Sequence, residues 1–197
     1  MDMNLAIGLT SFAFVTSITP GPNNLMLMAS GANFGFRRSL WHMVGINAGF
    51  ATLVVVAGLG LAGLIAAYPA SQTVLKVAAT AYMLWLAWKI AHATAPSGGR
   101  STGRPMTLLQ AAAFQWVNPK AWAMALGAVS AYSGAGDFAA ILSVGMVFSL
   151  VNLPCIAVWV VAGEGVRHVL TNPNRLAMFN WTMAVLLVLS LYPVLNL

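Results

Sequence analysis

The stretch Thr19-Pro20-Gly21-Pro22-Asn23-Asn24 interrupts an apolar run that extends from about residue 5 to residue 32. A run of this length predicts a membrane-spanning helix, because the hydrocarbon core needs roughly 20 apolar residues of helix. Each proline lacks an N–H and crowds the carbonyl group four residues earlier, which loses its helical partner. Unpaired backbone groups are costly in lipid unless protein or a water-filled cavity covers them. The break therefore predicts a cavity whose wall includes both asparagine amides, the alternative being a proline kink without a ligand.

The composition indicates a protein that crosses a membrane several times. Of the 197 residues, 60% are hydrophobic and 6% are charged, and the mean hydropathy is +0.83, whereas ordinary soluble domains carry about 25% charged residues. The net charge of +6 does not indicate nucleic-acid binding, because most basic residues lie in short loops between apolar spans. The single cysteine, Cys155, excludes an internal disulfide and a cysteine metal cluster. No cofactor is expected.

The apolar pattern predicts an all-α, polytopic membrane fold with six spans. Their approximate ranges are 4–32, 40–68, 72–93, 106–132, 137–161 and 176–195. The polar, glycine-rich segment 94–105 is the one clear linker. It divides a single transmembrane transporter domain, residues 1–197, into the halves 1–93 and 106–197. Because each half has three spans, a duplication would invert the second half relative to the first, with broken helices in spans one and four.

Arginines lie only in alternate loops, which predicts the orientation. The three basic loops hold Arg37 and Arg38, then Arg100 and Arg104, then Arg167 and Arg175. Cytoplasmic loops carry the excess of positive charge, so both termini should face the periplasm of a bacterial inner membrane. His42, His92 and His168 fall near the cytoplasmic side and match no metal-ligand spacing. They are expected at the membrane interface, and no metal site is expected.

A second break lies in the fourth span, at Gln115-Trp116-Val117-Asn118-Pro119-Lys120. Asparagine is a strong N-cap and proline is favoured at the first helical position, so a helix should begin at Asn118-Pro119. Asn118 lies about 16 Å into its span at 1.5 Å per residue. Spans one and four enter from opposite sides, so the N-termini of their second halves should face each other near mid-membrane. Free N–H groups and helix dipoles there predict a carboxylate site.

Lys120 is the one basic residue deep in a predicted span, where a charge costs about 3 kcal/mol. It is a candidate substrate ligand, the alternative being a side chain that extends to the cytoplasmic edge. No carboxylate lies at mid-membrane, since Asp2, Asp137 and Glu164 are at span ends. The substrate should therefore be neutral or zwitterionic. The candidate substrate-binding residues are Pro20, Gly21, Pro22, Asn23, Asn24, Asn47, Asn118, Pro119 and Lys120, and no catalytic residue is assigned.

These motifs make the sequence similar to the LysE/RhtB family of amino-acid exporters. The resemblance rests on the stretch 19–24, Gly35-Phe36-Arg37, Gly45, Gly49 and Asn118-Pro119-Lys120, and it covers the whole chain in length and span layout. Leu86-Ala87-Trp88-Lys89-Ile90 resembles the branch that exports cysteine and O-acetylserine. The resemblance implies export across the inner membrane, driven by the proton gradient. The acid expected in span two of branches that export basic amino acids is not evident here, where Asn47 is the polar residue, which disfavours lysine or arginine as substrate.

The hypothesis is thus a secondary exporter rather than an enzyme, whose partners are an amino-acid substrate and the lipid bilayer. A homo-oligomer is compatible with the chain, and nucleic acid is not an expected partner. The alternatives are a small integral-membrane enzyme and a channel. An enzyme needs a nucleophile with a base, or paired acids, at one depth, and a channel needs rings of like charge or a carbonyl filter motif. Neither pattern is visible in the sequence.

Overall fold

The computed structural model describes residues 3–61, 67–93, 103–133, 137–167, 169–170 and 172–192. Over these residues the chain is helical and contains no strand. The helices are α1 Met3–Ile18, α2 Pro22–Phe34, α3 Phe36–Val56, a π-helical turn Ala57–Leu61, α5 Pro69–Ala91, α6 Leu108–Gln115, α7 Pro119–Tyr132, α8 Phe138–Arg167 and α9 Pro173–Leu189. Most of the predicted linker, residues 94–102, lies outside the described residues, as do Asp2 and His168.

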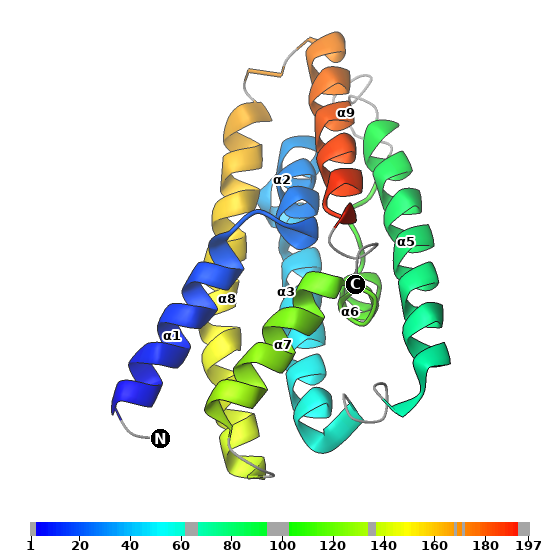
Figure 1. Ribbon diagram of the computed structural model, residues 1–197. Helices are drawn as coiled ribbons and strands as arrows, with labels where there is room; N and C mark the ends of the chain where they lie inside the picture. The colour runs from blue at the N-terminus through cyan, green and yellow to red at the C-terminus, as the bar shows by residue number, and fades with distance from the viewer. Residues whose placement is uncertain are drawn as a thin grey trace.

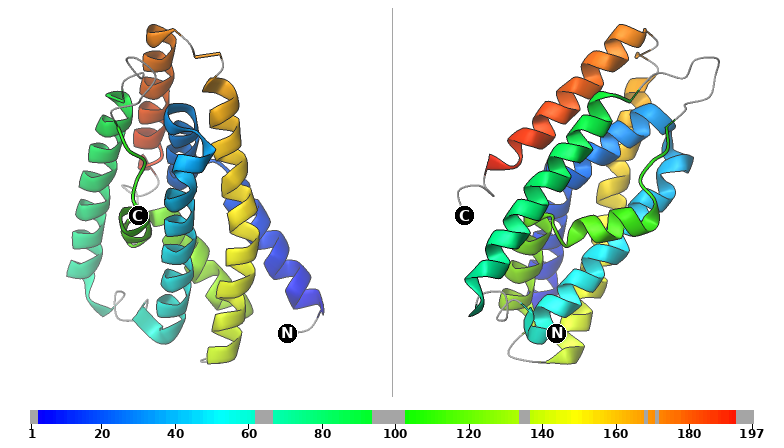
Figure 2. Two further views of the ribbon diagram at one scale, coloured as in Figure 1. Left: turned by 180° about the vertical axis from the view of Figure 1, so that it is seen from behind. Right: turned by 90° about the vertical axis from the view of Figure 1, so that its right-hand side faces the viewer.

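Three long helices, α3, α5 and α8, run along the length of the bundle, whereas α1 meets α2 and α6 meets α7 at about half its height (Figures 1 and 2). Among the described helices, the stretches Phe36–Gly60, Thr73–Ala91 and Phe138–Arg167 are long and apolar enough to cross a membrane. Helices α1 and α2 qualify together as one bent pair. Because α6, α7 and α9 have 8, 14 and 17 residues, the six-span arrangement remains a prediction.

The structure contains both predicted helix breaks. Helices α1 and α2 are bent by 55° relative to each other, and α2 begins with Pro22 after an extended Gly21. The predicted helix start at Asn118-Pro119 is confirmed, since Asn118 is the N-cap and Pro119 the first residue of α7. The Asn118 side chain accepts a hydrogen bond from Lys120 N at 3.1 Å. Proline and asparagine therefore fix the starts of both half-helices.

Glycines bring the helices around these breaks into backbone contact. A Cβ atom on Gly31 of α2 would collide with the backbone of α8, and one on Gly163 of α8 would collide with the backbone of α2. Gly45 and Gly49 of α3 lie equally close to the backbone of α6. Small residues allow this close approach between apolar helices. One half of each broken element, α2 in the first and α6 in the second, is thus packed closely against a long helix.

Several predicted span ends are wrong by a few residues. Helix α5 begins at Pro69 rather than near residue 72, because a proline is well tolerated in the first turn of a helix. Helix α8 continues six residues past the predicted end at 161, to Arg167, since Gly163 still packs against α2. Glu164 and Arg167 therefore lie in a helix, not in a loop. Helix α3 begins at Phe36, four residues before its predicted start at residue 40.

Basic residues gather at one end of the bundle. Helices α3 and α9 begin there, and α5 and α8 end there (Figure 1). Arg37 and Arg38 lie in the first turn of α3, Lys89 and Arg167 in the last turns of α5 and α8, and Arg175 in the first turn of α9. Helix α1 begins at the opposite end, where α7 ends and α8 begins (Figure 1). The segregation of charge that the sequence predicts is therefore present in the fold.

Candidate functional site

The carbonyl groups that the two prolines release have hydrogen-bond partners inside the protein. The Thr19 hydroxyl shares its one proton between the carbonyl oxygens of Val15 at 2.9 Å and Thr16 at 3.0 Å, which closes the last turn of α1. The indole N–H of Trp159, on α8, donates to the carbonyl oxygen of Ile18 at 3.1 Å. The expected cost of unpaired backbone at membrane depth is thus avoided by side chains. Trp159 also fixes the position of the break relative to α8.

Asn24 closes the break from the other side. Its amide Nδ2 donates to the carbonyl oxygens of Ser17 at 2.8 Å and Thr19 at 2.7 Å. The side chain is buried, so these bonds are shielded from water. A single amide can bridge two carbonyls only when the chain folds back sharply, as it does between α1 and α2. Asn24 therefore stabilises the sharp turn between α1 and α2, and it is also part of the pocket wall described below.

Lys120 connects the second break to the first. Its ammonium Nζ donates to the carbonyl oxygen of Thr19 at 2.7 Å, to Thr19 Oγ1 at 3.1 Å and to the carbonyl oxygen of Pro20 at 3.2 Å. The stem passes so close to Gly21 that a Cβ atom there would lie 2.7 Å from Lys120 Cδ. Three oxygen acceptors satisfy the three donors of an ammonium group. The half-buried side chain is thus directed at the first break, which does not favour the alternative in which it extends to the cytoplasmic edge.

A pair of amides makes a second connection between the breaks. Asn23 Nδ2 donates to Gln115 Oε1 at 2.8 Å, and Gln115 Nε2 donates to Asn23 Oδ1 at 3.0 Å. Gln115 Nε2 also donates to the carbonyl oxygen of Ala111 in its own helix. The first turn of α2 is therefore tied to the last turn of α6. Together with Lys120, this pair joins the two interrupted elements at one depth of the bundle.

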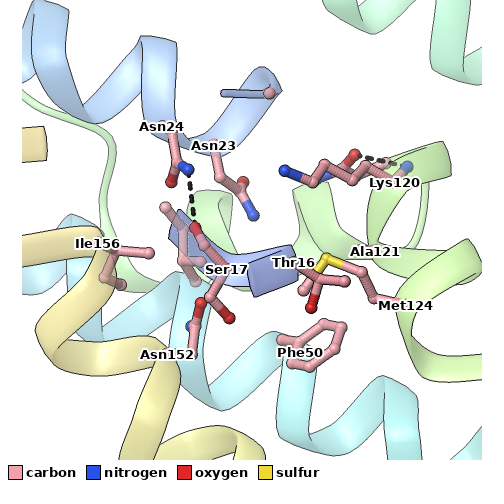
Figure 3. Close-up of a pocket in the computed structure, with 13 residues that line it drawn as sticks. Thr16, Ser17, Asn23, Asn24, Phe50, Lys120, Ala121, Met124, Asn152 and Ile156 are labelled. Carbon is pink, nitrogen blue, oxygen red and sulfur yellow. Dashed lines mark hydrogen bonds between the residues drawn. The ribbon is translucent and has the colours of Figure 1, made fainter. Parts of the chain in front are cut away.

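A small pocket lies where the breaks meet. Its lining residues come from α1, the first break, α2, α3, α7 and α8 (Figure 3): Thr16, Ser17, Gly21, Asn23, Asn24, Ile46, Phe50, Asn118, Lys120, Ala121, Met124, Asn152 and Ile156. Its volume of about 20 Å³ is close to that of a single water. On α8, Asn152 Nδ2 donates to Asn47 Oδ1 of α3 at 3.0 Å, so the two long helices are joined at the pocket wall. A pocket of this volume must widen before it can hold an amino acid.

The pocket offers polar groups but no carboxylate. Its lining includes the Lys120 ammonium and amides from Asn23, Asn24, Asn118 and Asn152, and no aspartate or glutamate. The Ser17 hydroxyl is buried and has no hydrogen-bond partner. A buried hydroxyl without a partner is unfavourable, and such exceptions call for an explanation such as a bound ligand or water. The first turns of α2 and α7 add the positive ends of two helix dipoles.

The predicted binding residues divide into two groups. Gly21, Asn23, Asn24, Asn118 and Lys120 line the pocket. The other four lie outside its lining but next to it. Pro20 accepts a hydrogen bond from Lys120, and Asn47 accepts one from Asn152. Pro22 and Pro119 are the first residues of α2 and α7. Whether any of them binds substrate stays a prediction.

Sequence reasoning missed four polar contributors, namely Thr16, Ser17, Gln115 and Asn152. Thr16 and Ser17 precede Pro20 by about one helical turn, and Gln115 precedes Asn118 by three residues. Polar residues one turn before a helix break are a usable signal, because the next turn exposes them to the cavity that the break creates. Asn152 had a sequence signal as the span-five counterpart of Asn47. Its direct bond to Asn47 depends on tertiary packing and could not be read from the chain.

A second, larger cavity opens at the basic end of the bundle. It has a volume of about 670 Å³ and lies between α2, α3, α5 and the segment that precedes α6. His42 of α3 borders it and is 2% exposed. The prediction of an interfacial His42 is therefore wrong, because α2 and α6 cover this face of α3. His92 is exposed at the end of α5, at the basic end of the bundle.

Comparisons with known proteins agree with this geometry. The profile of the family described as LysE type translocator matches residues 14–191, which include both breaks and every pocket-lining residue. Curated proteins of Escherichia coli O1:K1 / APEC and of Escherichia coli strain K12 are 34% and 33% identical over 121 residues. A protein of Shigella sonnei strain Ss046 is 33% identical over the same length. All three are named cysteine/O-acetylserine efflux protein.

The alignments cover 61% of this chain and 61% of each relative, so the match spans less than two thirds of the relatives' length. No solved structure matches the chain. The family profile, in contrast, covers most of the chain, from the second half of α1 to the end of α9. The long apolar helices fit a multi-pass membrane protein. The chain belongs to the LysE type translocator family.

Proposed function

We propose that the protein is a secondary exporter that moves a neutral or zwitterionic amino acid, or a close derivative, out across the inner membrane, coupled to the proton gradient. One observation carries the proposal. The N-termini of α2 and α7 meet at a single polar pocket that Lys120 crosses. Helix N-termini and an ammonium group are the features that bind a carboxylate inside a membrane. The α-carboxylate of the substrate therefore lies between the two breaks.

The other polar groups of the pocket suit the rest of an amino acid. An α-ammonium group needs acceptors, and the Ser17 hydroxyl and the side-chain carbonyls of Asn24 and Asn152 supply them. A substrate with a second positive charge would require a carboxylate, and none lines the pocket. The names of the relatives support cysteine and O-acetylserine as first substrates to test. Both carry one carboxylate, one ammonium group and a short polar side chain.

Lys120 also offers a way for binding to change the structure. In the small pocket its ammonium group binds the neutral carbonyl oxygens of Thr19 and Pro20. A carboxylate carries a full negative charge, so it attracts the ammonium group more strongly than a neutral carbonyl oxygen does. The substrate therefore competes for the ammonium group and loosens the contact between the two breaks. Because this contact joins spans one and four, its release allows the two parts of the molecule to move relative to each other.

The same proposal includes the architecture. We place spans one to three and four to six as inverted halves of one domain, with the linker in the cytoplasm and both termini in the periplasm. Matching breaks in α1–α2 and α6–α7 support the pairing of spans one and four. The gathering of basic residues at one end supports the orientation. Outward export is supported by the efflux function named for the relatives.

Counterflow into proteoliposomes tests the proposal. Vesicles are loaded with unlabelled amino acid, and uptake of radiolabelled O-acetylserine is followed. Cysteine and O-acetylserine should drive uptake, whereas lysine should not, since the pocket has no carboxylate for its second ammonium group. O-acetylserine amide should fail to compete, because it lacks the carboxylate. Equal counterflow with lysine, or equal competition by the amide, would contradict this binding mode, and the absence of any counterflow would contradict the transport function.

A further inference from the structure

His42 is a buried histidine whose ring makes no hydrogen bond. It is 2% exposed, and neither Nδ1 nor Nε2 has a partner. A neutral imidazole carries one donor and one acceptor, and burying both without partners is unfavourable. Among the described residues, the other buried side-chain polar atom without a partner is Ser17 Oγ in the small pocket. An ionisable group kept in a membrane helix against this cost is a candidate for function.

The ring borders the cavity of about 670 Å³ at the basic end of the bundle. Two other polar side chains of the wall already have partners, because Ser30 pairs with Ser39 at 2.7 Å and Asn33 pairs with Asn180 at 2.8 Å. The His42 nitrogens thus remain available next to a space large enough for many waters. Both are nevertheless covered in this conformation. A proton on the ring would be separated from the cavity water until neighbouring side chains move.

The charges around His42 favour release of a proton into that cavity. The charged and titratable residues on its own helix and on the elements around it are Arg37 and Arg38 of α3, Lys76, Tyr82, Lys89 and His92 of α5, Arg104 before α6, and Cys155, Glu164 and Arg167 of α8. Helices α2 and α6 contribute none. Those that line the cavity, Lys89, His92 and Arg104, are all basic. Glu164 and Arg167 lie beside Gly35, at the start of α3.

Helices α2 and α3 both extend from the surroundings of His42 to the small pocket. One turn after His42, α3 places Ile46 in the pocket wall, and Phe50 follows one turn later. Helix α2 likewise lines the pocket with Asn23 and Asn24 and the large cavity with its later turns. A movement of α2 or α3 that opens the pocket must therefore also change the cover over the His42 ring. Proton access and substrate access are mechanically linked.

We propose that His42 is the proton-binding site that couples this exporter to the pH gradient, an inference that rests on the proposed function. When the neighbouring side chains move and uncover the ring, the imidazolium passes an N–H proton to water of the large cavity, and the nitrogen keeps the electron pair. In the alternate conformation a proton from the opposite side binds that electron pair, and the cation drives the return step. Lys120 does not serve this purpose, because its three donors hold the break together.

The test compares two kinds of transport by the same proteoliposomes. Counterflow of radiolabelled O-acetylserine measures exchange and needs no net proton movement. Uptake into vesicles with an acidic interior measures coupled transport, because protons leaving the vesicle drive the substrate in. The variant is His42→Gln, which keeps a donor and an acceptor but cannot carry a proton. The matched control is His92→Gln, at the rim of the same cavity, where the ring is exposed.

We expect wild type and His92→Gln to show counterflow, and we expect the acidic interior to raise their rate of substrate uptake. His42→Gln should retain counterflow, but the acidic interior should not raise its rate of uptake. Acceleration equal to that of wild type, or loss of counterflow in a variant that folds, would overturn the inference. If His42→Gln does not fold, the test is made on the wild-type protein in detergent, by measuring the protons released when substrate binds. The inference predicts proton release, and binding without proton release would overturn the inference. A wild-type protein without counterflow would instead contradict the proposed function itself.

Discussion

At the scale of single residues, the pocket depends on groups whose partners are backbone atoms. Lys120 and Asn24 together satisfy the carbonyl oxygens of Ser17, Thr19 and Pro20. These side chains stabilise the break and also face the space where substrate is proposed to bind. A substitution should therefore affect transport without lowering stability only where the pocket side chain has no partner within the protein. One substitution at a bonded side chain and one at an unbonded side chain test this.

Lys120→Met removes a side chain with both roles. It leaves the Pro20 carbonyl without its ammonium partner, and loss of a hydrogen bond to a charged group lowers the free energy of unfolding by about 1.5–3 kcal/mol. It should also abolish counterflow, because the carboxylate ligand is lost. Thermal unfolding in detergent and counterflow measure the two effects. The control is Lys76→Met on α5, a lysine that lines neither cavity. Near-normal counterflow by Lys120→Met would remove the substrate role from Lys120.

Ser17→Ala should separate the two effects. The Ser17 hydroxyl has no hydrogen-bond partner in the small pocket, so its removal should leave thermal stability unchanged or slightly raised. If the hydroxyl binds the substrate, the half-saturating concentration in counterflow should rise about ten-fold, equivalent to roughly 1.4 kcal/mol. Ser149→Ala of α8 is the control, since that hydroxyl bonds to Gly145 O in its own helix. An unchanged half-saturating concentration for Ser17→Ala would exclude this contact.

At the scale of helices, the breaks could be predicted from sequence and the helix ends could not. Proline and asparagine act through local backbone chemistry, so Pro22 and Asn118-Pro119 indicated two helix starts without knowledge of the fold. The end of α8 depends instead on what lies beside it, and Gly163 packs against α2 two residues past the predicted end of the span at residue 161. The pairing of Asn33 with Asn180, which joins α2 to α9, is likewise invisible in the chain.

The packing of α2 on α8 gives a prediction at this scale. In Gly163→Ala the new Cβ collides with the α2 backbone, and overpacking should destabilise the protein by about 1–3 kcal/mol. Gly165, two residues later on the same helix, has no atom near its Cβ position. Gly165→Ala should therefore stabilise α8 by about 0.5–1 kcal/mol, because alanine loses less backbone entropy. Thermal unfolding in detergent measures both, and equal effects would contradict the proposed contact.

At the scale of the whole molecule, two cavities of different size lie along the same pair of helices. The small pocket lies where the breaks meet, and the large cavity lies at the basic end. Under the proposed function, the small pocket is the substrate site and the large cavity is a candidate access path from the basic end. The sequence predicted the central site through its breaks. The large cavity was not predicted, since its wall combines α2, α3, α5 and the segment before α6, which come together only in the fold.

Which side of the membrane the basic end faces is the last prediction, and α8 can decide it. This helix has 30 residues and is about 45 Å long at 1.5 Å per residue, enough to cross the bilayer with its headgroup regions. Its ends should therefore lie on opposite sides. Phe138 and Gly165 are exposed near the two ends, whereas the native Cys155 is buried. In a Cys155→Ser background, an impermeant maleimide should label Phe138→Cys in intact cells and Gly165→Cys only after permeabilisation. The reverse pattern would place the basic end in the periplasm and reverse the proposed direction of the whole bundle.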